Sequence, residues 1–399
     1  MTKSDDKRVP ALRFKGFTDE WEQRKLENIT KRISRKNLNL DSTLPLTISA
    51  QYGLVDQRKF FDKQIASKKL ENYLLLKNGE FAYNKSYSKD YPFGAIKRLN
   101  NYKLGVLSTL YIAFKPVSIN TDYLEEYFDS TKWYKEIYKR ATEGARNHGL
   151  LNISPQDFFE LNLSIPNNRI EQERISEILK LLSLLITLQQ RKVKLINKLK
   201  NALLTHFISK TSSQSASKTL KDITNIRGGY AFKSSEFTKS GFPVIKIANI
   251  SQNGEIEGPY SYVLSLKSDY QLAKNDIVLA MSGATTGKIA RVNSNNIYLQ
   301  NQRVGYFVNN HKIDYNYLYY LLISDQFKRQ LERILISGAQ PNVSASDIEK
   351  FKFVILKSKK QQSKISTLFK HIDYALKAGN NKMHTLIQIK QFLLQNMFI

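Results

Sequence analysis

The sequence predicts an α+β protein, a pseudo-two-fold internal repeat in which two mixed α/β domains are separated by two long, coiled-coil-like helices. Three observations predict this: stretches of the first half of the chain recur at one constant offset in the second half, each copy ends in a long amphipathic stretch, and the segments before these stretches mix strand-like and helical patterns. The expected boundaries are a domain at 1–165 with an N-terminal extension, a central helix at 166–209, a linker at 210–217, a second domain at 218–356 and a C-terminal helix at 357–399.

The repeat is clearest within the two long amphipathic stretches. Residues 171–179 match residues 361–369, and residues 199–204 match residues 389–394, so both pairs of segments have the same offset. An Asn-Ile/Val-Ser segment ahead of each helix, at 152–154 and at 342–344, recurs at this offset too. One duplication is too few for a solenoid and favours a two-fold arrangement.

The two amphipathic stretches carry matched heptad-like apolar stripes. A stripe on a single helix is usually only a face toward a core, and this interpretation stays open for each helix taken alone. Two matched stripes in one chain favour burial against each other as an intramolecular coiled coil. Gly379 leaves open whether the second helix is continuous or broken. The residues expected to pack between the helices are Ile175, Ile178, Leu182, Leu185, Ile196, Leu199, Leu203, Ile365, Leu368, Ile372, Leu386, Ile389 and Leu393.

The two domain segments mix strand-like and helical patterns. Short apolar runs bounded by Gly, Asn and Asp, such as residues 110–114 and 276–281, predict strands. Residues 123–140 and 315–334 instead show helical patterns. Small polar residues at 211–217 predict a linker between the two copies.

The charge balance restricts the partners of this chain. Its 399 residues hold 62 Lys and Arg against 35 Asp and Glu, a net charge of +27, which favours an acidic partner: nucleic acid, an anionic membrane or an acidic protein. The sequence has no apolar run of about 18 residues and no apolar segment in its charged N-terminus, so membrane attachment is not favoured. It has no cysteine, which excludes disulfides and thiolate sites. We therefore expect a soluble, cytoplasmic protein.

Several motifs resemble those of one family. Residues 10–17, followed by 21–26, resemble the start of many type I restriction-modification specificity subunits. Residues 228–234, 242–250 and 282–288 resemble the second target recognition domain of that family, and the long stretches resemble its spacer helices. The first domain segment matches mainly over a stretch that begins with Gly-Ala-Arg-Asn-His before the first helix.

The resemblance implies a fold and a function. It implies two target recognition domains, one for each half of a split DNA target, and two antiparallel spacer helices that fix the gap between the half-sites. The chain is then a non-catalytic, sequence-specific DNA-binding subunit of a bacterial multisubunit complex. Its partners are double-stranded DNA, two copies of an adenine methyltransferase subunit that brings S-adenosylmethionine, and motor-nuclease restriction subunits where the system has them. The alternative is a basic protein-interaction scaffold that does not read DNA sequence.

Candidate DNA-binding residues are cations, amides and aromatic side chains in predicted loops, and each loop also has a purely structural interpretation. The loop at 282–288 has three residues between its glycines and is followed by Ile289, so it lacks the pattern of a nucleotide-binding loop; it is a phosphate contact or a structural turn. Residues 227–230 are a DNA contact or a hairpin turn, and residues 300–303 are a base contact or a solvated loop. The repeated loops at 144–148 and 338–342 are DNA contacts or domain-packing segments. The candidates are Lys85, Tyr87, Lys89, Arg146, Asn147, Arg227, Tyr230, Lys233, Thr285, Lys288, Gln300, Asn301, Gln302, Arg303 and Gln340.

No catalytic or metal site is predicted. The five histidines are not paired with one another or with carboxylates at the spacing of metal ligands. The sequence lacks an Asn-Pro-Pro-Tyr or Asp-Pro-Pro-Tyr methyltransferase motif and a glycine-rich cofactor loop after a strand. We expect no catalytic residue, no metal and no cofactor bound by this chain.

Overall fold

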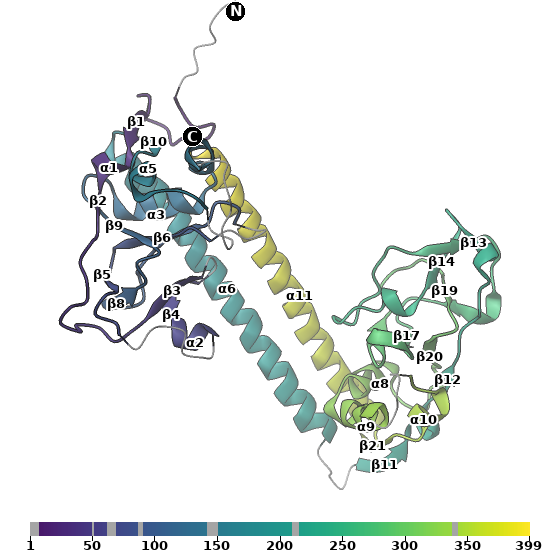
Figure 1. Ribbon diagram of the computed structural model, residues 1–399. Helices are drawn as coiled ribbons and strands as arrows, with labels where there is room; N and C mark the ends of the chain where they lie inside the picture. The colour runs from purple at the N-terminus through teal and green to yellow at the C-terminus, as the bar shows by residue number, and fades with distance from the viewer. Residues whose placement is uncertain are drawn as a thin grey trace, which may run out of the picture. The chain divides into compact units, whose positions relative to one another are not determined.

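The computed structural model describes residues 8–49, 52–61, 69–86, 91–141, 151–209, 215–336 and 342–399. The chain divides into two compact units: unit 1 comprises residues 1–190 and 381–399, and unit 2 comprises residues 191–380. Each unit contains one α/β domain and parts of the two long helices α6 (Arg169–Ser209) and α11 (Lys359–Asn396), which are labelled in Figure 1. No helix in the described part of the chain is both long and apolar enough to span a membrane.

Each domain is built on a four-stranded antiparallel sheet, and the two sheets have the same strand order. In unit 1 the order is β2-β9-β6-β7, and in unit 2 it is β12-β20-β17-β18. The strands are β2 (Thr30–Arg32), β9 (Ile112–Pro116), β6 (Phe81–Asn84), β7 (Ala95–Arg98), β12 (Ile226–Arg227), β20 (Val304–Phe307), β17 (Ile277–Ala280) and β18 (Ile289–Arg291).

Equivalent short elements connect each sheet to its long helix. Two-stranded antiparallel pairs form the base of each domain, and each is followed by α6 or α11. These elements are β1 (Glu22–Lys25), β10 (Asn162–Ile165), β11 (Ser215–Thr219), β21 (Lys352–Leu356), and the helices α1 (Leu26–Ile29), α5 (Pro155–Phe159), α7 (Leu220–Ile223) and α10 (Ala345–Glu349). Residues 215–217, expected in the linker, instead form part of β11 because their backbone pairs with β21.

The helical patterns predicted at 123–140 and 315–334 each form two helices. They are α3 (Thr121–Asp129) and α4 (Tyr134–Arg140) in unit 1, and α8 (Tyr315–Leu322) and α9 (Asp325–Ile336) in unit 2. A buried serine lies at each break: the Ser130 hydroxyl donates to the Tyr127 carbonyl, and the Ser324 hydroxyl to the Leu321 carbonyl, both at 2.6 Å. These bonds take up carbonyls at the end of the first helix, so the chain turns there.

The domains differ in what is added to the common sheet. Unit 1 adds a hairpin and a second strand pair, together with helix α2 (Gln57–Phe61). Unit 2 adds a five-stranded sheet of order β13-β15-β14-β19-β16, in which only β14 and β19 are parallel. The added strands are β3 (Leu46–Ser49), β4 (Gly53–Asp56), β5 (Leu74–Lys77), β8 (Leu104–Leu107), β13 (Phe237–Thr238), β15 (Ser261–Val263), β14 (Phe242–Ile245), β19 (Tyr298–Gln300) and β16 (Gln271–Leu272).

Within each unit the two long helices pack against each other in antiparallel register. In unit 1 the Lys390 ammonium donates to the Ser183 hydroxyl at 2.7 Å, and in unit 2 Lys200 pairs with Asp373 at 2.6 Å. Lys390 is the repeat equivalent of Lys200, and Asp373 is the repeat equivalent of Ser183, because both pairs have the offset of the matching helix segments. The two contacts are therefore the same contact in the two copies of the repeat, with the roles of α6 and α11 exchanged.

The observed seam differs in part from the predicted stripe. Ile175, Leu182 and Leu393 are buried in the core of unit 1, with Ile178 and Leu386 packed against it, and Leu203, Ile365 and Ile372 pack against the core of unit 2. Ile196 is half-buried. Leu185, Leu199, Leu368 and Ile389 are exposed, because the less exposed position lies one residue later in each of these heptads. Phe369 is buried there, and Ile186, Lys200 and Lys390 are half-buried. Helix α11 continues through Gly379 without a break.

Candidate nucleic-acid interface

Two of the predicted DNA-binding loops leave the same end of the four-stranded sheet of unit 2. Strand β17 ends at Ala280, β20 begins at Val304, and these two residues pair. The loops at 281–288 and 301–303 therefore start beside each other. The Met281 N–H donates to the Arg303 carbonyl at 3.0 Å, which holds them together.

A third predicted segment joins this edge. The Tyr230 N–H donates to the Gln300 carbonyl, and the Gln302 N–H donates to the Tyr230 carbonyl, both at 2.9 Å. A Cβ atom at Gly229 would lie 2.1 Å from the Asn301 carbonyl oxygen, so this close approach requires glycine. We use the name recognition rim for residues 227–233 and 300–303 together.

Gln300 does not present its amide to solvent. It is fully buried, its Oε1 accepts from the Arg227 Nε and Nη2 at 3.2 Å, and its Nε2 donates to the carbonyls of Arg227 and Val304 at 2.8 and 2.6 Å. The amide is thus saturated inside the domain. The prediction that Gln300 contacts a base is corrected: this side chain holds Arg227.

Arg227 is held on several sides. Its Nη2 also donates to the Gln271 carbonyl at 3.0 Å, and its guanidinium lies 4.6 Å from the centroid of the Tyr306 ring. Burial raises the pKa of the neighbouring Asp276 carboxyl, while the Ala273 N–H bond and the Arg227 charge act in the opposite direction. Arg227 therefore stabilises the rim through these bonds, and its half-buried guanidinium remains partly exposed to solvent.

The remaining rim side chains face outward. Lys233, Gln302 and Arg303 are exposed, and Asn301 and Tyr230 are half-buried. Among the described residues, no side-chain hydrogen bond or ion pair occupies the Arg303 guanidinium or the Gln302 amide. Guanidinium and amide groups are the side chains that pair bidentately with guanine and adenine edges in the major groove. The rim has the chemistry of direct base reading.

Two aromatic residues of the rim extend into a larger cluster that includes a cation. The Tyr230 ring lies 4.8 Å from Phe232 and 5.5 Å from Tyr270, and the Lys267 ammonium lies 4.9 Å from the Tyr230 ring centroid. Sequence reasoning missed Tyr270 and Lys267. Both are distant from Tyr230 in the sequence, and neither stands in a motif.

The glycine loop, predicted as a phosphate contact or a structural turn, runs from the end of β17 to the start of β18. Residues Gly283–Thr285 form a single 3-10 turn, and Thr285 is half-buried. The chain returns to the sheet at Lys288, whose carbonyl accepts from the Ala280 N–H at 3.0 Å. The Lys288 side chain lines a cleft of about 440 Å³ in unit 2, together with Lys200 and Lys328. The structure therefore places Lys288 beside two other cations on the helix side of the domain.

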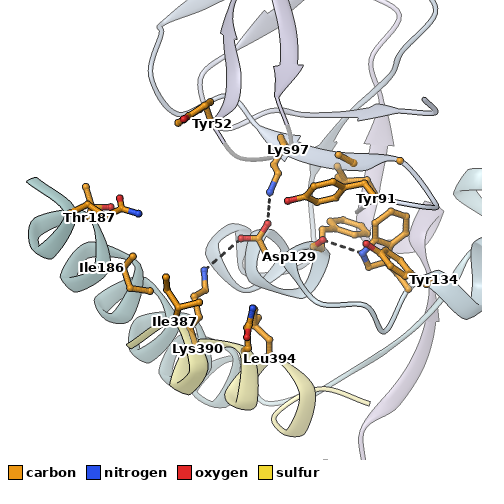
Figure 2. A pocket seen from close by; sticks show the side chains of 17 residues that line it. Tyr52, Tyr91, Lys97, Asp129, Tyr134, Ile186, Thr187, Ile387, Lys390 and Leu394 are labelled. Atoms are coloured by element: carbon orange, nitrogen blue, oxygen red, sulfur yellow. Dashed lines mark hydrogen bonds and ion pairs between the residues drawn. The ribbon is translucent and has the colours of Figure 1, made fainter. Parts of the chain in front are cut away.

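Unit 1 contains an equivalent cleft of about 900 Å³, shown in Figure 2. Lys97 and Lys390 approach Asp129 from opposite sides, at 2.6 and 3.6 Å. Burial lowers the pKa of Lys97, but the charge and hydrogen bond of Asp129 outweigh it, and the net pKa is raised. Both lysines pair with Asp129, so this cleft ties the domain to the helices.

Most predicted DNA-binding residues of the first copy lie outside the described part of the chain. These are Tyr87, Lys89, Arg146 and Asn147, and in the second copy Gln340. Lys85 is described: it is half-buried, and its ammonium donates weakly to the Ile153 carbonyl at 3.4 Å.

An exposed aromatic and basic cluster in unit 1 was not predicted. Helix α2 carries Arg58, Lys59, Phe60 and Phe61 on the surface, with the two phenyl rings 4.9 Å apart. Tyr52, just before the preceding strand, is also exposed. The run of cations and aromatic residues at 58–61 is the sequence signal that would have found it.

No group of three or more His, Asp or Glu side chains in the described part of the chain is arranged to hold a metal ion. Acidic side chains along the two helix–domain junctions are instead paired with lysines.

Comparisons with known proteins agree with this architecture. Residues 213–387 match the family model described as the type I restriction modification DNA specificity domain. The type I restriction enzyme MjaVIII specificity subunit of Methanocaldococcus jannaschii is 25% identical over 316 residues, which cover 72% of each chain. The crystal structure of a type I restriction-modification S subunit from M. genitalium has the same fold, with a TM-score of 0.63 and 16% identity over 98% of this chain and 99% of that one. A chain from a structure of a type I R-M system aligns with a TM-score of 0.56 and 12% identity, over 95% of this chain and 97% of that one.

Proposed function

We infer that this chain, which belongs to the family of type I restriction-modification specificity subunits, selects the DNA sequence on which separate methyltransferase and restriction subunits act. As a specificity subunit it is the non-catalytic component of the system. The observation that carries this inference is the match of residues 213–387 to the DNA specificity domain, because these residues contain the whole recognition rim.

We propose that each domain reads one half of a split target. The support is the repeated plan: both domains have the same four-stranded sheet, but different strands are added to it. A common frame with different loops suits two modules that hold DNA in the same way and read different bases. The net charge of +27 supplies the attraction to phosphate, which positions the modules but carries no sequence information.

A leucine-rich face on α6 is the proposed docking surface for the methyltransferase. Leu181, Leu184, Leu185 and Leu188 are each 40–55% exposed, a large apolar cost for a surface that stays in water. With about 100° between successive helix residues, most of this face is turned away from Ile186 and Gln190, which line the cleft in unit 1. The face therefore points away from the recognition domain.

The charges around this face define the partner. From 178 to 209 the sequence contains cations and no Asp or Glu, so the matching surface is apolar with acidic flanks. We propose that two copies of the methyltransferase subunit dock, one on each unit, and that they bring S-adenosylmethionine. Restriction subunits join through that complex where they are present.

The experiment that tests this function is a methylome. The chain is expressed with its neighbouring methyltransferase subunit in a bacterium without restriction systems, and methylated adenines are mapped by single-molecule sequencing, with and without this chain. We expect one split motif, two short half-sites around a fixed gap, that disappears when the chain is omitted. Methylation that persists unchanged without the chain would favour a basic scaffold that reads no sequence.

A further inference from the structure

The start of each long helix carries a buried glutamine in the same bonding arrangement. In unit 1 the Gln172 Nε2 donates to the Pro166 carbonyl at 2.8 Å, and its Oε1 accepts from the Asn120 N–H at 2.9 Å. In unit 2 the Gln362 Nε2 donates to the Leu356 carbonyl at 2.7 Å, and its Oε1 accepts from the Asp314 N–H at 2.8 Å. Both glutamines are 5% exposed or less.

The bonds join three separate parts of each unit. Pro166 directly follows β10 and Leu356 ends β21, the last strand of each domain. Asn120 and Asp314 are the N-cap residues of α3 and α8. The glutamine belongs to the first turns of α6 or α11. One amide therefore fixes the sheet, a domain helix and the spacer helix against each other. We call this arrangement the amide clamp.

The amide clamp uses both functions of its side chain. An amide donates and accepts at the same time, whereas a carboxylate only accepts and an apolar side chain does neither. A buried glutamine amide that both donates and accepts is costly to misplace, since a shift of the helix relative to the domain breaks one of these bonds away from solvent. The clamp resists sliding and tilting of the helix.

A lysine node adds a second point of attachment in both units. In unit 1 Lys390 contacts the Glu126 carboxylate on α3 at 3.1 Å, in addition to Ser183. In unit 2 Lys200 contacts Asp373, whose other oxygen accepts from the Tyr320 hydroxyl on α8 at 2.8 Å. Glu126 and Tyr320 lie at equivalent positions, because each stands equally far after the N-cap of its helix. Two attachment points on each domain leave it little freedom to pivot on the helix pair.

We propose that Gln172 and Gln362 are positioning residues for DNA reading: each fixes the angle of one recognition domain on the spacer helices, and together they set the gap between the half-sites. This inference rests on the proposed function. Neither glutamine contacts DNA in this proposal. Each acts through the orientation of a reading surface.

The test uses the complete complex with its methyltransferase and three DNA substrates. The substrates share both half-sites of the mapped motif and have a gap of the wild-type length, one base pair less or one base pair more. Gln172→Leu keeps the approximate size of the side chain and removes both bonds, while Gln172→Glu keeps the acceptor for the Asn120 N–H and loses the donor. Gln395→Leu, an exposed glutamine on α11 in the same unit, is the matched control.

The measured quantity is the methylation rate on each altered gap divided by the rate on the wild-type gap. A fall in the amount of folded complex lowers all three rates equally, so this ratio is insensitive to it. We expect the ratio to rise about tenfold in Gln172→Leu and less in Gln172→Glu. A change of about tenfold corresponds to the free energy of the one or two hydrogen bonds that hold the helix against the domain. Gln362→Leu is expected to act in the same way, and the control to leave the ratio unchanged.

Discrimination against single mismatches within each half-site should stay at the wild-type level, because the rim is intact. An unchanged gap ratio in the Gln172 and Gln362 variants, or equal losses on all substrates, would reduce the clamp to a structural role and overturn the proposal. If the wild-type complex methylates no split motif, the proposed function itself fails, which is a different result.

Discussion

Arg303 provides the sharpest test of where unit 2 reads sequence. Its side chain is exposed, and no described residue holds its guanidinium, so Arg303→Ala should change the free energy of unfolding by no more than about 0.5 kcal/mol. A bidentate arginine–guanine pair contributes about 1–3 kcal/mol of discrimination against the wrong base. This corresponds to roughly 5- to 150-fold in relative affinity.

The assay measures affinity of the complex for a panel of duplexes in which each base pair of the mapped motif is replaced in turn. We expect Arg303→Ala to lose preference at one position of the half-site read by unit 2 and to keep it at all positions of the other half-site. Arg329→Ala removes an exposed arginine from α9 and serves as the charge control. A uniform loss of affinity over the whole panel would show that Arg303 contacts phosphate, and a panel identical to wild type would refute base reading by the rim.

Three further predictions concern the rim, the docking face and the cleft. Gln300→Leu should lower the free energy of unfolding by about 2–4 kcal/mol in chemical denaturation, because it leaves the buried polar partners of the amide unpaired. Leu184→Asp should abolish co-purification of the methyltransferase, while Leu110→Asp, at an even more exposed site in the first domain, should not; equal binding by both variants would remove α6 as the docking face. Lys288→Ala should reduce the slope of log affinity against log salt by about 1 if it contacts phosphate, and an unchanged slope would leave the glycine loop structural.

The internal repeat was predictable because it appears in the order of residues themselves, and the fold confirms the order of domains and helices. The helix seam was predictable only in part. Apolar residues occupy both sides of it, so the stripe in the sequence is wider than the contact and does not say which edge is buried. Seam positions 200 and 390 are lysines, which a search for apolar residues passes over.

The recognition rim shows a different limit of sequence reasoning. The run Gln300–Arg303 was identified as a candidate, but its four residues do not act alike. Gln300 ends strand β19 and points into the domain, whereas Gln302 and Arg303 lie in the turn that follows. The inward direction depends on Arg227, far away in the sequence, which the Gln300 amide binds. Tertiary partners of this kind are not visible in a local pattern.

The two units show what the repeat has kept and what it has changed. The lysine node is built from Lys390 and Glu126 in one unit and from Lys200, Asp373 and Tyr320 in the other, so the acid stands on the domain in one copy and on the helix in the other while the attachment persists. The amide clamp is kept even in residue type. A fixed gap requires a rigid attachment in each unit, whereas the reading loops must differ if the half-sites do. Retained clamps and altered loops are therefore expected of a protein that holds two different reading domains at a fixed separation.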